Sequence, residues 1–541
     1  MGIKVLEDKD IIIVGSGIGG LVAAKKASDQ GLDVMLVSSS KFGGGASFFP
    51  LKGTLGIQAT ASFQKDEKLF YEDIARVGLR MDNPHMVQGY IKNIRKSIDY
   101  LKEIGFEPWL RGDNRPACFA KYPRDIYLIN NWDKARDNGK KIFDSIENIT
   151  IKEECKIVKI LQRDGAVKGV IFQNGEEEFF LVRTKAIIMA TGGVAGLYKH
   201  NLYPTDVDGT GHIVALDAGA KVVNMEFIQF IPAFISPKYN TLYGEHTAKY
   251  VLGMYDLNGK LIYPGIDSDK KDYWLERSSY APFSCDFKSF EIDLAMIKAI
   301  GEGSEGVELK FHKDLYEDKG EFYTVYLSWL KDSLNIDMCR DKIVIAPFAH
   351  GCNGGVMVTD CGETGVKGLF AIGELSSSVE GANRLGGNSV GGALVFGNRA
   401  ALKAWEYIAN LPNETILTED LIDEFISWKN EILKDNKNTS SLKENEKNIL
   451  ELKKIMTLHG GIKREEKSLD EGLEKLKNIK PNSIELYLKI ESAKLLLNSM
   501  KMRKESRGAH YREDFPKRDS KTYRVIVSRL NNKFKVEKEY L

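Results

Sequence analysis

A glycine run placed between a strand and a helix constrains this chain more than any other feature. Asp10–Val14 is a short, continuous apolar run, which is typical of a strand buried on both faces. Gly15-Ser16-Gly17-Ile18-Gly19-Gly20 follows it directly, and the sequence then predicts a helix over 21–27 and a second strand over 34–37. This is a βαβ unit with G-x-G-x-x-G at its first turn, the position at which that pattern indicates a dinucleotide site.

The spacing of the run has a physical reason. Gly15 permits the tight turn, Gly17 lets a pyrophosphate approach the backbone, and Gly20 lets the helix pack closely against the strand. The phosphate charge then lies at the N-terminus of the helix. We include Ser16 and Gly19 of the same turn among the predicted cofactor contacts.

Three further segments extend the predicted cofactor site. The second strand ends in Ser38 where an Asp or Glu is common, and its hydroxyl can still bond a ribose, so this ending argues against NAD more than against a nucleotide. Thr191 and Gly192 follow a buried strand in an A-T-G-G turn, which is an independent marker of a nucleotide fold. A Gly-rich loop over 42–60 suits close approach of the backbone to a flat ring, and its predicted contacts are Ala46, Ser47 and Gly53.

Bulk properties exclude several classes of protein. The chain has 541 residues, of which 77 are basic and 76 acidic, and this balance argues against nucleic acid or an acidic membrane surface as the main partner. No apolar run reaches about 18 residues, so we predict no transmembrane helix. The six cysteines form no CxxC pair, which predicts no metal or iron–sulfur site within this chain and is typical of the reducing cytoplasm.

Changes of character along the chain predict its domains. A Rossmann-like α/β domain is expected in two parts, 1–236 and 346–412, because the parallel-strand signal resumes at 368–374. Residues 237–345 mix aromatic, Ser and charged residues and are expected to form an inserted domain. Residues 413–541 are rich in Lys, Glu and Leu at helical spacing and are expected to form a helical C-terminal domain.

Four stretches together resemble one family, which comprises L-aspartate oxidase and the flavoprotein subunits of succinate dehydrogenase and fumarate reductase. They are Asp10–Ala24 with Val37-Ser38; Ala190–Gly193 continuing to Asp217–Ala220 and Met225–Phe230; His350–Val356 with Ala371–Glu374 and Gly381–Ser389; and Glu505–Pro516. The last two are highly specific, and the resemblance spans most of the chain.

The resemblance implies FAD on the Rossmann-like domain, a mobile α+β capping domain at 237–345, and hydride transfer between flavin N5 and a substrate carbon beneath the cap. The cofactor contacts that it adds are Ile157, Asp208, Glu374, Asn388, Ser389 and Val390. Glu374 would bind the ribityl chain. The last three would lie at the isoalloxazine, where N–H groups of a helix start stabilise negative charge on the reduced ring.

The same resemblance implies that His350 and Arg384 are the catalytic pair that holds a substrate carboxylate. The residue types suit that task, because an Arg fork makes two parallel charge-assisted bonds to a carboxylate. A neighbouring His adds a donor and can carry positive charge. The substrate is therefore expected to be a small anionic organic molecule.

Two departures from the family pattern concern the far end of the substrate and the flavin linkage. Ile231 and Ala233 stand where the family has the His and Thr that follow its Glu-Phe-Val-Gln-Phe stretch. A carboxylate facing Ile231 would lose a charged hydrogen bond worth roughly 1.5–3 kcal/mol. Residues 46–54 contain no His for a covalent flavin bond, so non-covalent FAD is expected, as in L-aspartate oxidase.

A third departure concerns the cap Arg that moves the proton in the family. Phe283 or Ile292 aligns with it, and neither can transfer a proton; Arg277 or Lys288 lies nearby and could substitute. We therefore expect an oxidoreductase that acts on a C–C or C–N bond of a small organic acid, and not a standard fumarate or succinate enzyme. The alternatives are an L-aspartate oxidase-like enzyme, an electron-transfer subunit whose iron–sulfur cluster lies on a partner chain, and a flavin-binding regulator without catalysis.

Overall fold

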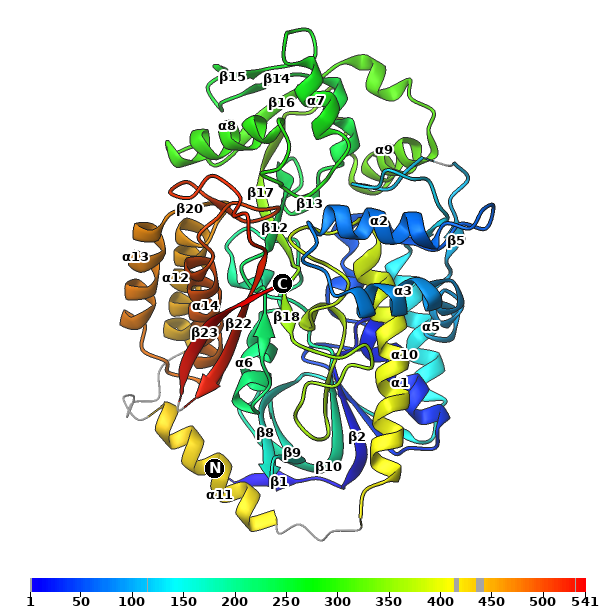
Figure 1. Cartoon of the computed structure of the whole chain (residues 1–541), viewed down its shortest axis with the longest axis vertical. Coiled ribbons are helices and arrows are strands. Elements are labelled where there is room, and N and C mark those ends of the chain that lie inside the picture. Colours follow the sequence, from blue (N-terminus) through cyan, green and yellow to red (C-terminus); the bar gives the residue numbers. More distant parts are fainter. Residues whose placement is uncertain (1, 114, 413–417, 434–441, 531) are drawn as a thin grey trace.

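The structure is a computed structural model that describes residues 2–113, 115–412, 418–433, 442–530 and 532–541. Figure 1 shows an α/β domain in the lower half, a cap at the top and a helical bundle at the left. The segments 1–236 and 346–412, far apart in sequence, meet in the α/β domain, where α1 (Ile18–Asp29) and α10 (Asn388–Ala409) lie side by side.

The central sheet has eight strands. Its order is β7 (Ile149–Lys152), β3 (Val34–Val37), β2 (Lys9–Val14), β10 (Phe179–Met189), β9 (Ala166–Asn174) and β8 (Cys155–Arg163), with β1 (Ile3–Val5) and β19 (Leu369–Ala371) also paired to β10. Pairing is parallel from β7 through β10 and antiparallel from β10 to β8. The predicted Rossmann-like sheet is therefore confirmed.

Burial of β2 on both faces explains its continuous apolar run. Ile11 and Ile13 join a core formed with α1, α10 and α3 (Pro84–Ser97), whereas Ile12 and Val14 join the core on the opposite face, beside α6 (Thr210–Asp217). Smaller elements extend the first of these faces: β4 (Leu55–Gln58), α2 (Glu67–Val77), α4 (Tyr100–Glu103), β5 (Trp109–Leu110), β6 (Ile126–Ile129) and α5 (Trp132–Asp144).

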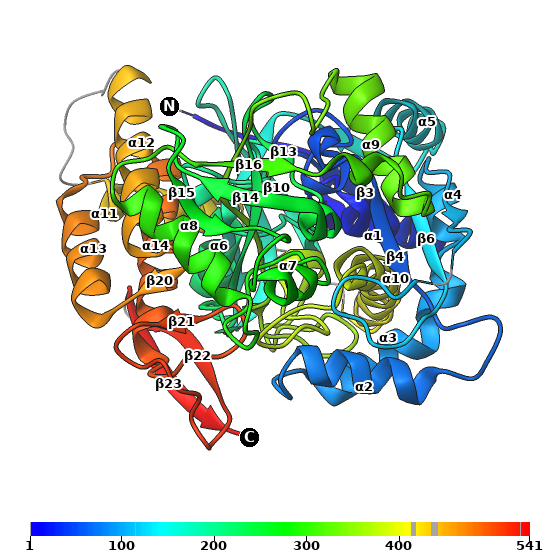
Figure 2. The same cartoon turned by 90° about the horizontal axis from the view of Figure 1, so that it is seen from above.

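The cap is built on an antiparallel sheet. The order of its strands is β13 (Thr241–Leu242), β12 (Ile228–Ser236), β17 (Ile343–Cys352), β16 (Val307–Phe311), β14 (Val251–Tyr255) and β15 (Leu261–Pro264). Helices α7 (Lys271–Arg277), α8 (Phe290–Gly301) and α9 (Glu321–Leu334) accompany the sheet, as Figure 2 shows from above. The long strands β12 and β17 run from the α/β domain into the cap, so the predicted boundary at 345 falls inside β17.

The C-terminal region contains helices and, unexpectedly, a β-hairpin. The helices are α11 (Thr418–Ile432), α12 (Leu442–His459), α13 (Glu466–Asn478) and α14 (Ile484–Met502). Among the described residues, no helix combines the length and the apolar character needed to cross a membrane. The predicted start of this domain, residue 413, lies outside the described residues.

The predicted helical C-terminal domain is confirmed, but the last residues of the chain depart from it and form strands. β22 (Tyr523–Leu530) and β23 (Lys533–Tyr540) form a hairpin that joins β11 (Val222–Val223) and β18 (Gly355–Val356) in a four-stranded sheet. The alternate residues Tyr523, Val525 and Val527 are buried, which is the two-residue period of a strand. The Lys-rich composition hid this alternation.

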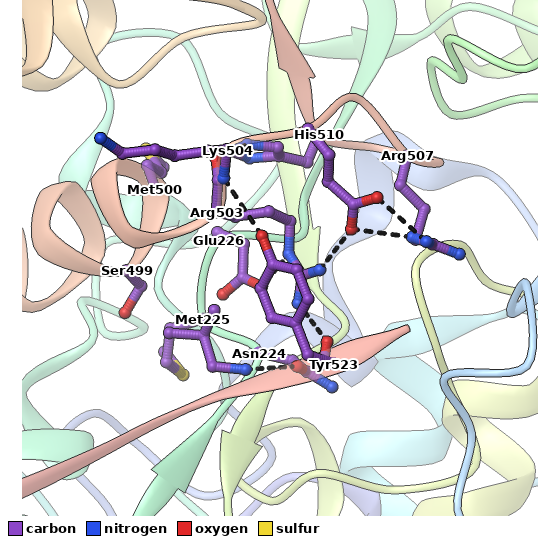
Figure 3. Close-up of polar contacts among 12 residues, drawn as sticks. Asn224, Met225, Glu226, Ser499, Met500, Arg503, Lys504, Arg507, His510 and Tyr523 are labelled. Atoms are coloured by element: carbon purple, nitrogen blue, oxygen red, sulfur yellow. Dashed lines mark hydrogen bonds and ion pairs between the residues drawn. The ribbon is translucent and has the colours of Figure 1, made fainter. Parts of the chain in front are cut away.

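A buried ionic network anchors the C-terminal segment to the α/β domain (Figure 3). Arg503 donates to Glu226 and to Glu505, each over 2.6 Å, and to the carbonyl of Tyr523 over 2.9 Å. Glu505 also accepts two bonds of 2.9 Å from Arg507. The charged members of this network are almost fully buried, so each charge depends on its partner. Beside the network, β20 (Lys463–Arg464) pairs with β21 (Tyr511–Arg512).

Candidate flavin and substrate site

A long cleft opens at the carboxyl ends of β2 and β10, the usual place for ligands in an open α/β sheet. Its volume is about 910 Å³ when the space open to solvent is included. The predicted cofactor residues in its wall are Gly15, Ser16, Gly17, Gly19, Ser38, Ala46, Ser47, Ile157, Thr191, Gly192, Asp208 and Glu374. Thr191 Oγ1 and Asp206 Oδ1 lie on this wall and have no hydrogen-bond partner among the described residues. Buried polar atoms without partners indicate that the wall is built to receive a polar ligand.

The glycine run forms the phosphate end of the cleft. α1 begins after Gly17, and no side chain caps its N-terminus. The N–H of Ile18 donates to Ser47 Oγ over 3.2 Å, which ties the Gly-rich loop to the turn. Gly20 does not line the cleft: a Cβ there would lie 1.8 Å from the carbonyl oxygen of Gly15, so Gly20 permits close packing of the helix, and its contact with a cofactor stays a prediction.

The wall of the cleft also carries serine hydroxyls and the buried carboxylate of Asp208. Ser38 Oγ lies 2.8 Å from Ser16 Oγ. Asp208 lies 3.1 Å from the ammonium of Lys489 on α14 and 3.4 Å from that of Lys156. Burial disfavours the charged form of Asp208, but the two lysines together outweigh burial and hold the pKa of that carboxyl well below its usual range. The cleft is thereby linked to the helical domain.

Four predicted cofactor residues besides Gly20 lie away from this wall. Gly53 (φ +70°) faces the cap, where a Cβ would lie 2.9 Å from Trp329 of α9. Asn388, Ser389 and Val390 do begin helix α10, as expected, after Gly387 at φ +89°. Asn388 Oδ1 accepts a hydrogen bond of 3.3 Å from Tyr90. Their contact with a flavin stays a prediction.

His350 and Arg384 come from β17 and from the loop before α10. Arg384 donates to the hydroxyl of Ser389, and its Nε has no partner among the described residues; the same holds for His350 Nδ1. Burial, with Lys52 and Arg384 nearby, lowers the pKa of His350 well below its ordinary value. This direction favours the neutral form of His350, which would act as a hydrogen-bond donor or acceptor beside Arg384.

Glu374 connects the cleft to this pair. Its carboxylate accepts a hydrogen bond of 3.0 Å from the N–H of Cys352 and another from the hydroxyl of Tyr203. The ring of Tyr203 meets the His350 ring edge-on, with centroids 6.3 Å apart. Burial raises the pKa of Glu374 above its ordinary value, against the opposing effect of these donors and of Lys52 and Arg384. The carboxyl is thus engaged on the protein side of the site.

Ile231, which stands where the family has a His, lies in an apolar environment. Ile231 is 4 % exposed and belongs to a cluster with Leu202, Ala233, Ala346 and Phe348. Ala281 of the cap packs against the same cluster. Phe348 pairs with Ile231 and lies two residues before His350, at which the pairing of β12 with β17 is irregular. An apolar wall therefore lies next to the anion-binding pair.

Three of the four candidates for the missing cap Arg are held in the protein interior, and the fourth, Lys288, lies on the surface. Arg277 is buried, lies 3.2 Å from Asp293, and donates to the carbonyls of Tyr280 and Ala281 over 2.5 and 3.2 Å. Lys288 is exposed, with its ammonium over the ring of Tyr273. The other two, Phe283 and Ile292, are each 2 % exposed in apolar cores. Arg277 is a structural residue of the cap.

Two ionisable residues near the site escaped the sequence interpretation. Lys52 is a lone lysine in an apolar loop, and it lies within electrostatic range of Glu374, Arg384 and His350. Glu245 lies in the cap near Arg277, and burial raises its pKa. Neither lies in a motif, and only the three-dimensional structure brings them to the site.

Cys118 occupies the seam between the cap and the Arg384 loop. Its Sγ accepts a bond of 2.9 Å from the N–H of Ala281, and its carbonyl accepts one of 3.1 Å from Gly386. Burial, together with the charge of Glu245, raises its pKa well above the ordinary value, so it is a thiol that packs and does not react.

Comparison with known proteins agrees with this geometry. Residues 10–247 and 326–390 match the family model described as "FAD binding domain", and residues 481–540 match that described as "Fumarate reductase flavoprotein C-term". The chain is 29% identical over 530 residues to an FAD-dependent oxidoreductase of Methanocaldococcus jannaschii, with 94% of each chain covered. It is 28% identical over 545 residues to the L-aspartate oxidase of Yersinia pestis, with 94% of this chain and 96% of the relative covered.

The fold is shared with solved structures at lower identity. The E. coli quinol fumarate reductase chain superposes with a TM-score of 0.78 at 22% identity, covering 99% of this chain and 97% of that one. The cleft, its glycine turn and its unpartnered polar atoms fit FAD, which, when bound, would supply two-electron chemistry beside His350 and Arg384. The chain thus belongs to the family of FAD-dependent oxidoreductases that includes fumarate reductase and succinate dehydrogenase flavoproteins and L-aspartate oxidase.

Proposed function

We propose that this enzyme transfers hydride between non-covalently held FAD and a small organic acid that has one anionic end and one apolar end. The observation that carries the proposal is the apolar cluster around Ile231, set beside the unpartnered nitrogens of His350 and Arg384. Arg384 would receive the carboxylate as a charge-assisted pair, and neutral His350 would add a hydrogen bond. The cap would exclude water from the bond that reacts.

An anaerobic screen tests this proposal. The purified flavoprotein is mixed with small carboxylates as reductants, and the photoreduced protein with small enoates as oxidants, while flavin absorbance is followed. We expect acids with one carboxylate and a short apolar chain to exchange electrons faster than fumarate or succinate. Reoxidation by fumarate at the rate of a dedicated fumarate reductase would contradict the proposal.

L-aspartate belongs in the same screen, because several relatives are named L-aspartate oxidase. A second carboxylate directed at Ile231 would find no donor in the apolar cluster, so we expect slow reduction by L-aspartate. Rapid reduction by L-aspartate, but not by its monocarboxylate analogues, would favour the oxidase instead.

A second proposal concerns the electron partner. Two relatives carry names of subunits, one of them from the CoM/CoB fumarate reductase of Methanothermobacter marburgensis. We propose that an iron–sulfur protein on another chain exchanges electrons with this flavoprotein in the cytoplasm, a compartment that suits its six free cysteines. Affinity purification at native abundance tests this: a stoichiometric iron–sulfur partner supports it, and full turnover by the isolated chain with a soluble acceptor opposes it.

A further inference from the structure

We propose that Lys52 is the counter-ion of this site, whose ammonium balances negative charge that collects between the flavin cleft and the His350–Arg384 pair. The inference rests on the proposed function, since it assumes that an anion and a flavin meet there. The charge has two sources, the bound substrate and the reduced flavin. Both present the same chemistry to a cation.

The backbone holds Lys52 at the seam between the cap and the α/β domain. Pro50–Lys52 form a single 3₁₀ turn that contacts β13 of the cap. Gly53 follows in a left-handed conformation, directly against the Trp329 ring of α9. The turn is therefore fixed between two domains, and the side chain cannot reach open solvent without movement of the cap.

The ammonium is buried and has no partner. Lys52 is 6 % exposed, and within the described residues its ammonium makes no hydrogen bond and no ion pair. Its nearest recorded contacts are the rings of Tyr203 and Phe49, whose centroids lie 4.9 and 5.9 Å away. A lysine is almost never buried in this way unless something pairs with it. The ring faces attract the cation but leave its three donors unused.

The charged groups that face Lys52 do not fully balance its positive charge, so an added anion would be attracted to it. Glu374 attracts it and Arg384 repels it, while burial lowers its pKa to about 8. The Glu374 carboxyl is already engaged by Tyr203 and Cys352. His350 is neutral. Lys52 is thus a cation at neutral pH, and its nearest carboxyl is bound elsewhere.

The position of Lys52 is also consistent with the replacement of the family His by Ile231, which removes a charged donor from the site. Ile231 removes one charged donor from the apolar end, and Lys52 adds a cation next to Tyr203 and Glu374. An anion held by Arg384 therefore meets its second positive charge toward the flavin cleft, which is where negative charge also grows when a flavin is reduced.

The experiment uses the FAD-loaded protein and the variants Lys52→Met, Lys52→Arg and Arg384→Met, each with its FAD content measured first. One arm titrates propionate against the visible spectrum of the oxidised flavin. The other titrates sulfite, an anion that adds to flavin N5, and records the flavin midpoint potential. We expect Lys52→Met to weaken at least one ligand by roughly tenfold or more, the loss of one charged hydrogen bond, while Lys52→Arg stays within about threefold of the parent.

The two titrations distinguish the substrate from the reduced flavin as the source of the negative charge. They also distinguish failure of the Lys52 proposal from failure of the proposed function. A loss confined to propionate assigns the charge to the substrate. A loss confined to sulfite, with a potential lower by about 30 mV per tenfold for a two-electron couple, assigns it to the flavin. Both affinities within about twofold of the parent overturn the role of Lys52. Unchanged propionate binding in Arg384→Met would instead overturn the proposed function.

A measurement on the unaltered protein keeps the inference testable if the variants lose FAD. Binding of propionate, of sulfite or of both should weaken as the pH rises through the Lys52 pKa of about 8, since the ammonium then loses its proton. Flat affinities for both ligands across that range, with the flavin still bound, would also overturn the proposal.

Discussion

Substitution of two glycines of the same turn should have different effects: at Gly17 it should prevent cofactor binding, and at Gly20 it should prevent folding. Gly17 has φ −72° and ψ 175°, an ordinary extended conformation, and a Cβ there would meet only Ser47 Oγ at 3.4 Å. The protein fold therefore has room for a side chain at Gly17. A Cβ at Gly20 would lie 1.8 Å from the carbonyl oxygen of Gly15, and this backbone cannot yield without parting β2 from α1.

These distances set the expected magnitudes. A glycine replaced where the backbone is compatible changes the free energy of unfolding by about 0.4–1 kcal/mol in favour of the folded state. Gly17→Val should therefore fold, but its branched side chain projects into the cleft and excludes the pyrophosphate. FAD at about 1,000 times its Kd stabilises the parent by about 4 kcal/mol, and Gly17→Val should gain none of this.

The assay is FAD content after purification, followed by thermal unfolding with and without added FAD. Gly17→Val should be soluble, colourless and insensitive to FAD, whereas Gly20→Ala should be largely insoluble. The steric argument would be refuted by a yellow Gly17→Val protein with one FAD per chain. It would also be refuted by a Gly20→Ala protein as stable as the parent.

Three other perturbations test the site and its support. Arg384→Ala should weaken carboxylate binding by about tenfold or more at unchanged FAD affinity, since Arg384 is not among the residues that line the flavin cleft. Loss of FAD in an apo-protein titration would make Arg384 structural. Arg503→Met should lower the free energy of unfolding, measured by chemical denaturation, by about 3–5 kcal/mol because it leaves buried Glu226 without its partner. Adding Glu226→Gln should recover part of this loss. A loss below about 1 kcal/mol would contradict the role of the ionic network. Burial lowers the pKa of His212 to about 4. Between about pH 6.5 and 4 the unfolded chain therefore binds a proton at His212 that the folded chain does not, so the free energy of unfolding decreases as the pH is lowered through this range. At pH 5 this costs on the order of 2 kcal/mol, and a His212→Gln variant with the same pH profile of denaturation midpoints as the parent would sink this assignment.

The sequence predicted correctly those elements whose residue pattern is set by their own burial or by a family-specific stretch. The strand before Gly15 was predictable because burial on both faces demands a continuous apolar run. The family-specific stretches predicted FAD and the fold, which the family matches confirm. The hairpin at Tyr523–Tyr540 was missed because its buried face is built from every second residue within a Lys-rich segment.

The candidate site was less predictable because its electrostatics depend on burial. The charge state of His350 follows from desolvation and from two cations brought near it by other segments, one of them Lys52. Arg277 looked like a substitute for the family Arg until its partner Asp293, on another helix, was known. Residues such as these acquire their chemistry from neighbours distant in sequence, which no single stretch reveals.

The anchoring of the C-terminal segment has a kinetic consequence. Arg503 bonds to Glu226 across 277 positions of the chain. The N–H of Ala509 donates to the carbonyl of Ala382, in the loop that carries Arg384. Contacts between such distant segments form late in folding, because a long loop must close before they contribute. On a ribosome, the nucleotide cleft is synthesised first and the support of the Arg384 loop last. A newly made chain would therefore have a place for its cofactor before it has a finished place for its substrate.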